Sequence, residues 1–95
     1  MKKFELGEIV WDRGNKRYGV VIATWDDDPH EVRLDSDGVQ PVEDLFFVGS
    51  LLDKGKGKQM VDAIESYQRL CRNYPENNYP SLKYRKNGKV INFDF

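Results

Sequence analysis

Two residue types that most catalytic and disulfide-stabilised proteins use are nearly absent from this sequence. Its 95 residues include 1 cysteine and 1 histidine. A lone cysteine cannot build an intrachain disulfide framework, which favours a reducing, cytoplasmic compartment. Cys71 falls on an apolar helical stripe, where a small core residue is expected, and His30 falls in an acidic turn with no nucleophile beside it. The sequence therefore predicts no enzyme activity and no cofactor.

A strong excess of one charge and long apolar runs are also missing. The net charge is −1, which excludes a strongly basic nucleic-acid protein and a strongly acidic tail protein. No apolar run follows the charged start of the chain, so we expect neither a signal peptide nor a membrane span. The acidic run 26–31 contains Pro29 and lacks the spacing of an EF-hand loop, which favours a solvated turn over a metal site.

What the sequence does contain is enough for one modest core. A chain of this length buries about 60–65% of its unfolded surface. Large core residues are supplied by 2 Trp, 5 Tyr and 5 Phe. Charge is unevenly placed, because residues 1–50 carry 6 basic and 11 acidic side chains, whereas residues 51–95 carry 9 basic and 5 acidic ones. We therefore expect one monomeric domain with an acidic first half and a basic second half.

The first half of the sequence has the composition of a small β-structure. Five runs rich in β-forming residues alternate with turn signals, at 9–11, 18–25, 31–34, 39–42 and 45–48. The Asp-Gly turn at 37–38 precedes the fourth run, and Pro41 within that run indicates an edge strand. Five short strands at this spacing predict a small barrel or sandwich over residues 4–49.

The periodicity changes in the second half. Residues 50–57 include two glycines and are expected to form a flexible linker. Apolar residues then recur at the 3.6-residue spacing of a helix, which is predicted over 58–73, or 58–74 with its last turn, because Pro75 ends it. The residues on its apolar face are Met60, Val61, Ile64, Tyr67, Leu70, Cys71 and Tyr74.

A β-hairpin is predicted at the end of the chain, over residues 81–95. Asn87-Gly88 is a strong signal for a two-residue type I′ turn, and it pairs Lys86 with Lys89. The same register places four apolar side chains on one face, whereas a slip by one residue would scatter them. Those side chains are Leu82, Tyr84, Ile91 and Phe93. Two strands alone are marginally stable in water, so this face is expected to cover another element, and the helix is the nearest candidate. The apolar face of the helix is expected to pack against the hairpin, the barrel or both.

Several short segments of the first half occur in a characteristic order. They are Gly7-Glu8-Ile9-Val10-Trp11, Gly19-Val20-Val21, Val32-Arg33-Leu34, Asp37-Gly38 and Val42-Glu43-Asp44-Leu45. In this order they resemble an SH3-like barrel of the KOW and Tudor type, and the resemblance covers residues 6–49. KOW members usually have a further glycine in the first loop, where this chain has Lys16 or Arg17. That departure weakens the case for the ribosome- and transcription-related roles of the KOW group.

The Tudor resemblance implies an aromatic cage that holds a partner. The side chains that would form it here are Trp11, Tyr18, Trp25 and Phe47. The acidic residues Asp26, Asp27 and Asp28 follow Trp25 directly, and both carboxylates and ring faces attract cations. We therefore expect a non-catalytic module that binds a basic peptide or a basic protein surface through these residues. The alternative for the same rings is that they only fill the core.

The basic second half predicts an alternative function, which is nucleic-acid binding. Lysines and arginines interleaved with tyrosines are typical of a surface that binds single strands. The candidate residues are Lys54, Lys56, Lys58, Arg69, Arg72, Lys83, Arg85 and Lys86. The glycine- and lysine-rich run 54–58 precedes a helix N-terminus that would suit a phosphate, although such runs are more often connectors. Complementarity between the two charged halves would account for the same residues without a ligand.

Overall fold

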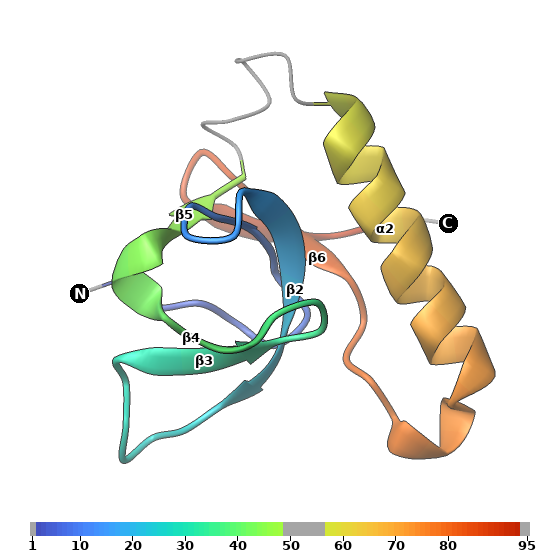
Figure 1. Ribbon diagram of the computed structural model, residues 1–95, viewed down its shortest axis with the longest axis horizontal. Helices are drawn as coiled ribbons and strands as arrows, with labels where there is room; N and C mark the ends of the chain where they lie inside the picture. Colours follow the sequence, from blue (N-terminus) through green and yellow to red (C-terminus); the bar gives the residue numbers. More distant parts are fainter. Residues whose placement is uncertain (1, 49–56, 94–95) are drawn as a thin grey trace.

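The computed structural model describes residues 2–48 and 57–93 and shows an α+β protein (Figure 1). Its first five strands are β1 Ile9–Asp12, β2 Arg17–Thr24, β3 Glu31–Leu34, β4 Gly38–Pro41 and β5 Leu45–Phe47, with a 3₁₀ turn, η1 Val42–Asp44, before β5. Helix α2 Gly57–Asn73, a 3₁₀ turn, η2 Pro75–Asn77, and strands β6 Lys83–Lys86 and β7 Lys89–Asn92 follow. The predicted strands and helix are confirmed. The predicted linker at 50–57 lies outside the described residues except for Gly57, which begins α2.

The first five strands form one antiparallel sheet in the order β4-β3-β2-β1-β5. β5 forms the other edge of the sheet and pairs with β1, opposite residues 10–12. The first half of β2 pairs with β1 and its second half with β3, and a bulge between Val21 and Ala23 bends the strand. β4 is an edge strand, so the interpretation of Pro41 is confirmed.

Alternation along β2 divides the core into two clusters on opposite faces of the sheet. Tyr18 and Val20 point to the face that α2 covers, where the buried residues also include Ile9, Val48, Met60, Tyr67 and Leu82. Val21 points to the other face, with Phe4, Val10, Val32, Leu34, Val42 and Leu45. Helix α2 packs against β2 (Figure 1), so the helix completes the core of the sheet.

Helix α2 buries an apolar stripe, as its periodicity predicts, but the stripe is narrower than predicted. Met60 and Tyr67 are buried and Ile64 is half-buried. Val61 is 51% exposed, and Tyr74, which lies beyond the last helical residue, is also exposed. The expectation that these two residues belong to the buried face is wrong, because α2 packs mainly against one strand, and a helix covered on one side buries a narrow stripe. In the described ranges no helix is long and apolar enough to cross a membrane.

The C-terminal hairpin has the predicted register. Its strands pair through Lys83↔Asn92, Tyr84↔Ile91, Arg85↔Val90 and Lys86↔Lys89. Asn87 and Gly88 have φ angles of 52° and 78°, and a type I′ turn requires positive φ at both positions. Leu82 is buried in the cluster shared with α2, so the hairpin does cover the helix side of the sheet. Ile91 is exposed although the pattern places it on the same face.

A buried ion pair fastens the hairpin to the sheet. Glu8 is fully buried, and its carboxylate accepts hydrogen bonds from Nε of Arg85 at 3.0 Å and from Nη2 at 2.9 Å. Hydrogen bonding to Glu8 raises the pKa of Arg85 above its ordinary value. The Glu5 N–H donates to the same carboxylate at 3.1 Å. Beside the pair, the Lys83 N–H donates to the Gly7 carbonyl at 2.8 Å. We call Glu8 and Arg85 the hairpin latch.

Candidate functional site

The four aromatic residues that were predicted to form a cage do not all meet at one place. Trp11 and Tyr18 pack edge to face, with ring centroids 4.9 Å apart, on the α2 side of the sheet. Tyr18 is 3% exposed, so its ring is part of the core. Phe47 belongs to the other cluster, where its centroid lies 4.9 Å from that of Phe4. Trp25, at the start of the β2–β3 loop, is the exposed ring among the four.

Trp25 lines a hollow of about 290 Å³ at the end of β2. The carboxylates of Asp26 and Glu31 also line it, together with the apolar side chains of Phe4 and Val42. A neighbouring hollow shares three lining residues, Lys2, Glu31 and Val42, with the first. The remaining lining residues are Lys2, Lys3, Thr24, Pro29 and Val32, and we call this whole surface the Trp25 hollow.

Carboxylates of the β2–β3 loop bring negative charge to the Trp25 hollow. Asp26 and Glu31 form no salt bridge within residues 2–48 and 57–93. Asp27 and Asp28 continue the acidic run along the loop and are exposed. The Asp28 carboxylate accepts a hydrogen bond from the His30 N–H at 3.3 Å, which caps the turn and leaves the negative charge in place. The predicted acidic turn at 26–31 therefore lies directly beside the exposed Trp25.

Two lysines at the edge of the Trp25 hollow oppose this charge only in part. The Lys2 ammonium donates to the Leu45 carbonyl at 2.7 Å and lies 4.0 Å from the centroid of the Phe46 ring. Its charge is thus directed to β5, although its side chain also lines the hollow. Lys3 is the second lysine of the lining and is exposed. In the lining, Lys2 and Lys3 thus balance Asp26 and Glu31, and the negative charge that remains is that of Asp27 and Asp28 along the loop.

The basic residues of the alternative nucleic-acid surface are only partly available to a ligand. Lys54 and Lys56 lie outside the described residues. The exposed candidates are Lys58, Arg69, Arg72 and Lys86. Arg85 is held in the hairpin latch, and the Lys83 ammonium donates to the Leu6 carbonyl at 3.2 Å. Two of the predicted cations therefore stabilise the hairpin, as the complementarity of the two halves suggests.

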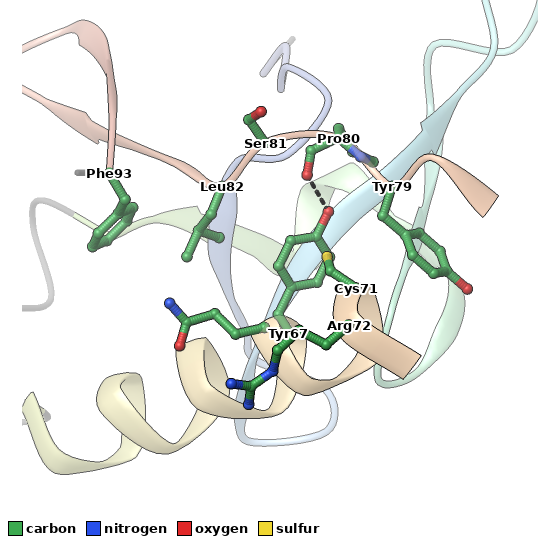
Figure 2. A pocket seen from close by; sticks show the side chains of 9 residues that line it. Tyr67, Cys71, Arg72, Tyr79, Pro80, Ser81, Leu82 and Phe93 are labelled. Atoms are coloured by element: carbon green, nitrogen blue, oxygen red, sulfur yellow. Dashed lines mark hydrogen bonds between the residues drawn. The ribbon is translucent and has the colours of Figure 1, made fainter. Parts of the chain in front are cut away.

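A larger hollow, which the sequence analysis did not predict, lies between α2 and the chain that follows η2 (Figure 2). Its volume is about 490 Å³. The lining residues are Tyr67, Gln68, Cys71 and Arg72 from α2, Tyr79, Pro80, Ser81 and Leu82 from the returning chain, and Phe93. The Tyr67 hydroxyl donates to the Pro80 carbonyl and joins the two walls (Figure 2). We call this hollow the α2 groove.

Cys71 packs against the core cluster, as expected of a small core residue on the apolar stripe, but it is only half-buried and also lines the α2 groove. The helical stripe correctly predicts that Cys71 points inward with Tyr67. What faces it, however, is residues 79–82, which lead into β6. Spacing along the chain carries no signal for that long-range contact. The sequence therefore indicated the apolar stripe of α2 and the hairpin face with Leu82 and Phe93, but not the hollow between them.

Among the carboxyl groups of the described residues, Asp35 is the one whose pKa the fold clearly shifts. Burial raises its pKa above the usual 3.8, although the Val20 N–H donates a hydrogen bond of 2.7 Å to its Oδ1 and favours the ionised form. Within the described ranges, no three His, Cys, Asp or Glu side chains are grouped so that they could hold a metal ion.

Comparisons of the chain with protein-family models, with curated proteins and with solved structures gave no match. Function therefore follows from the chemistry of the Trp25 hollow and of the α2 groove.

Proposed function

We propose that this protein is a non-catalytic interaction module that binds a basic segment of a partner protein in the Trp25 hollow. The observation that carries the proposal is that Trp25, a 37% exposed tryptophan, lines one hollow together with the acidic residues Asp26 and Glu31. A ring face and carboxylates both attract cations, so a lysine or arginine side chain is the group that suits the hollow. Asp27 and Asp28 extend the negative charge along the loop, which favours a segment with more than one basic residue.

The topology supports the further proposal of an SH3-like barrel of the KOW and Tudor type. β5 pairs back with β1, η1 separates β4 from β5, and the bent β2 pairs with both β1 and β3. The proposed site is smaller than the predicted aromatic cage, because Trp25 acts with carboxylates and Tyr18 belongs to the core. The lone cysteine favours a reducing, cytoplasmic compartment for this module.

The affinity expected from this surface is modest. One cation over an exposed aromatic ring contributes about 0.5–1 kcal/mol. Each exposed ion pair adds about 0.2–1 kcal/mol, and salt screens it. A segment with two or three basic residues therefore binds weakly, exchanges fast and loses affinity as the salt concentration rises.

The proposal is tested by following the amide resonances of the isotope-labelled protein during titration with the peptide acetyl-Ala-Lys-Ala-Arg-Ala-Lys-amide at low salt. We expect the resonances of residues 24–31 to shift. Trp25→Ala, and separately Asp26→Asn with Glu31→Gln, should each weaken binding about fivefold, which corresponds to about 1 kcal/mol. Glu65→Gln is the matched control, because it removes an exposed carboxylate from α2, away from the hollow.

An unchanged spectrum in the β2–β3 loop, or an equal loss of affinity in the Glu65→Gln control, would contradict the proposed site. The same titration with oligothymidylate tests the nucleic-acid alternative. Because Lys83 and Arg85 are held internally, we expect no binding of the oligonucleotide. Salt-dependent shifts around Lys58 and Arg69 would instead favour nucleic-acid binding.

A further inference from the structure

The α2 groove has the form of a site for an apolar side chain. Tyr67 and Leu82 are buried, while Tyr79 and Phe93 lie on either side of them (Figure 2). Cys71 lines the groove from the helix. A volume of about 490 Å³ is ample for one large apolar side chain and its neighbours, and ligand pockets usually span about 300–1,000 Å³. Apolar surface of this kind favours burial by a partner.

An unpaired cation lies at the edge of this apolar surface. Arg72 is exposed, and its guanidinium has no salt-bridge partner within residues 2–48 and 57–93. Its side chain extends past Tyr67 along the helix side of the groove (Figure 2). By contrast, Arg13, Arg17 and Arg85 each pair with a carboxylate of this chain. The groove therefore offers a free guanidinium next to an apolar hollow.

We infer that the α2 groove binds an acidic–apolar segment of a partner protein. An aromatic or aliphatic side chain of that segment enters the hollow beside Tyr67, and a neighbouring aspartate or glutamate meets Arg72. Charge complementarity sets the sign of the ligand, because a guanidinium holds a carboxylate through two parallel hydrogen bonds. The inference goes beyond the proposed function, since the surface differs from the Trp25 hollow and the ligand has the opposite charge.

A nucleic-acid strand suits this groove less well than a peptide does. Binding of single strands requires a row of cations beside successive bases. Lys83, which directly follows the groove residue Leu82, donates to the Leu6 carbonyl, and Arg85 is bound to Glu8. Among the described residues that line the groove, Arg72 is the one cation, and it lies beside one apolar hollow. This arrangement matches a ligand with one carboxylate beside one apolar side chain.

The chain carries its own reporter for the α2 groove, because Cys71 is its only cysteine and lines it. Random linear peptides displayed on phage are selected on the full chain, and the selected peptides are tested for protection of Cys71 against N-ethylmaleimide by mass spectrometry. We expect the protecting peptides to combine an aromatic or aliphatic residue with aspartate or glutamate. Arg72→Glu should weaken their binding about tenfold, and Arg72→Lys should weaken it less.

Trp25→Ala is the matched control, because it alters the other hollow and should leave protection of Cys71 unchanged. Arg72 is exposed, so an unchanged amide spectrum of Arg72→Glu verifies that the fold is intact. The inference is overturned if no selected peptide protects Cys71, if protecting peptides have no excess of acidic residues, or if Arg72→Glu binds them equally well. Stronger protection by oligothymidylate than by any peptide would assign the groove to nucleic acid. Failure of the basic peptide to bind at the Trp25 hollow leaves these outcomes unaffected, so the two proposals fail separately.

Discussion

Replacement of Glu8 by glutamine tests how the C-terminal hairpin is held to the sheet. Glu8 is 0% exposed, and the Arg85 side chain, 19% exposed, donates two hydrogen bonds to its carboxylate. Glutamine keeps the shape of the side chain but removes its charge, so the guanidinium remains largely buried without a counter-charge. Removing one partner of a buried pair costs about 3–5 kcal/mol, and the partial exposure of Arg85 places the expected loss near the lower end.

Urea denaturation measures this loss. With a slope of about 1 kcal/mol per M for a small chain, the Glu8→Gln midpoint should fall by roughly 3 M. A double-mutant cycle compares Glu8→Gln, Arg85→Met and the variant that carries both substitutions. The stability losses of the two single variants should not add, and the coupling energy should be about 1–3 kcal/mol. Arg13→Gln is the control, because its pair with Asp44 is exposed and should contribute less than about 1 kcal/mol. If Glu8→Gln loses no more than this control, the reasoning about the hairpin latch is refuted.

Three further predictions concern single positions and use the same denaturation assay. Gly7→Ala should lower the free energy of unfolding by about 1–3 kcal/mol more than Gly88→Ala does. A Cβ at Gly7 would lie 2.0 Å from the Ser81 carbonyl oxygen, whereas a Cβ at Gly88 would have no atom within 4 Å. Equal losses in the two variants would show that the hairpin moves aside. Asp12→Ala should lower the free energy of unfolding by about 1–3 kcal/mol, because the buried Asp12 carboxylate accepts hydrogen bonds from the Gly14 and Asn15 N–H groups of the β1–β2 loop. A loss under about 0.5 kcal/mol would contradict this role. Because burial raises the pKa of Asp35, its contribution to stability is fully present below the usual pKa of 3.8 and is lost as pH rises through the raised pKa. The stability of Asp35→Asn relative to the unsubstituted chain should therefore rise as the pH is raised from acidic to neutral. A stability difference between the two proteins that does not vary with pH would contradict the raised pKa of Asp35.

Local features made most of the secondary structure predictable. The Asn87-Gly88 turn determines the pairing of β6 with β7, because a two-residue type I′ turn permits one register. The edge position of β4 followed from Pro41, since a proline cannot donate a hydrogen bond to a neighbouring strand. In both cases the physical cause lies within a few residues of its effect.

The features that hold distant segments together were not predictable in the same way. Glu8 and Arg85 are separated by 77 positions, and Glu8 is buried although charged residues are usually expected at the surface. Asp12 is also a fully buried acid, and nothing in a short β-forming run distinguishes it from an exposed strand residue. The position of the hairpin, and with it the second wall of the α2 groove, depends on such contacts. The sequence therefore indicated the Trp25 loop, which is local, and the two apolar faces beside the groove, but not the hollow that residues 79–81 form between them.

The two hollows consequently depend on different parts of the fold, and a last prediction separates them. One wall of the α2 groove is residues 79–82, which lead directly into β6, and β6 is held by the hairpin latch and by the hydrogen bond from Lys83 to Gly7. Loosening the latch with Glu8→Gln should therefore open the groove and speed the labelling of Cys71 by N-ethylmaleimide at urea concentrations where the chain is still folded. The indole of Trp25 lies in the β2–β3 loop, so its fluorescence, measured in a Trp11→Phe background, should not change under the same conditions. If Cys71 reacts at the same rate in both proteins, the groove is held by α2 and the Tyr67–Pro80 hydrogen bond alone, and the hairpin latch has no part in forming it.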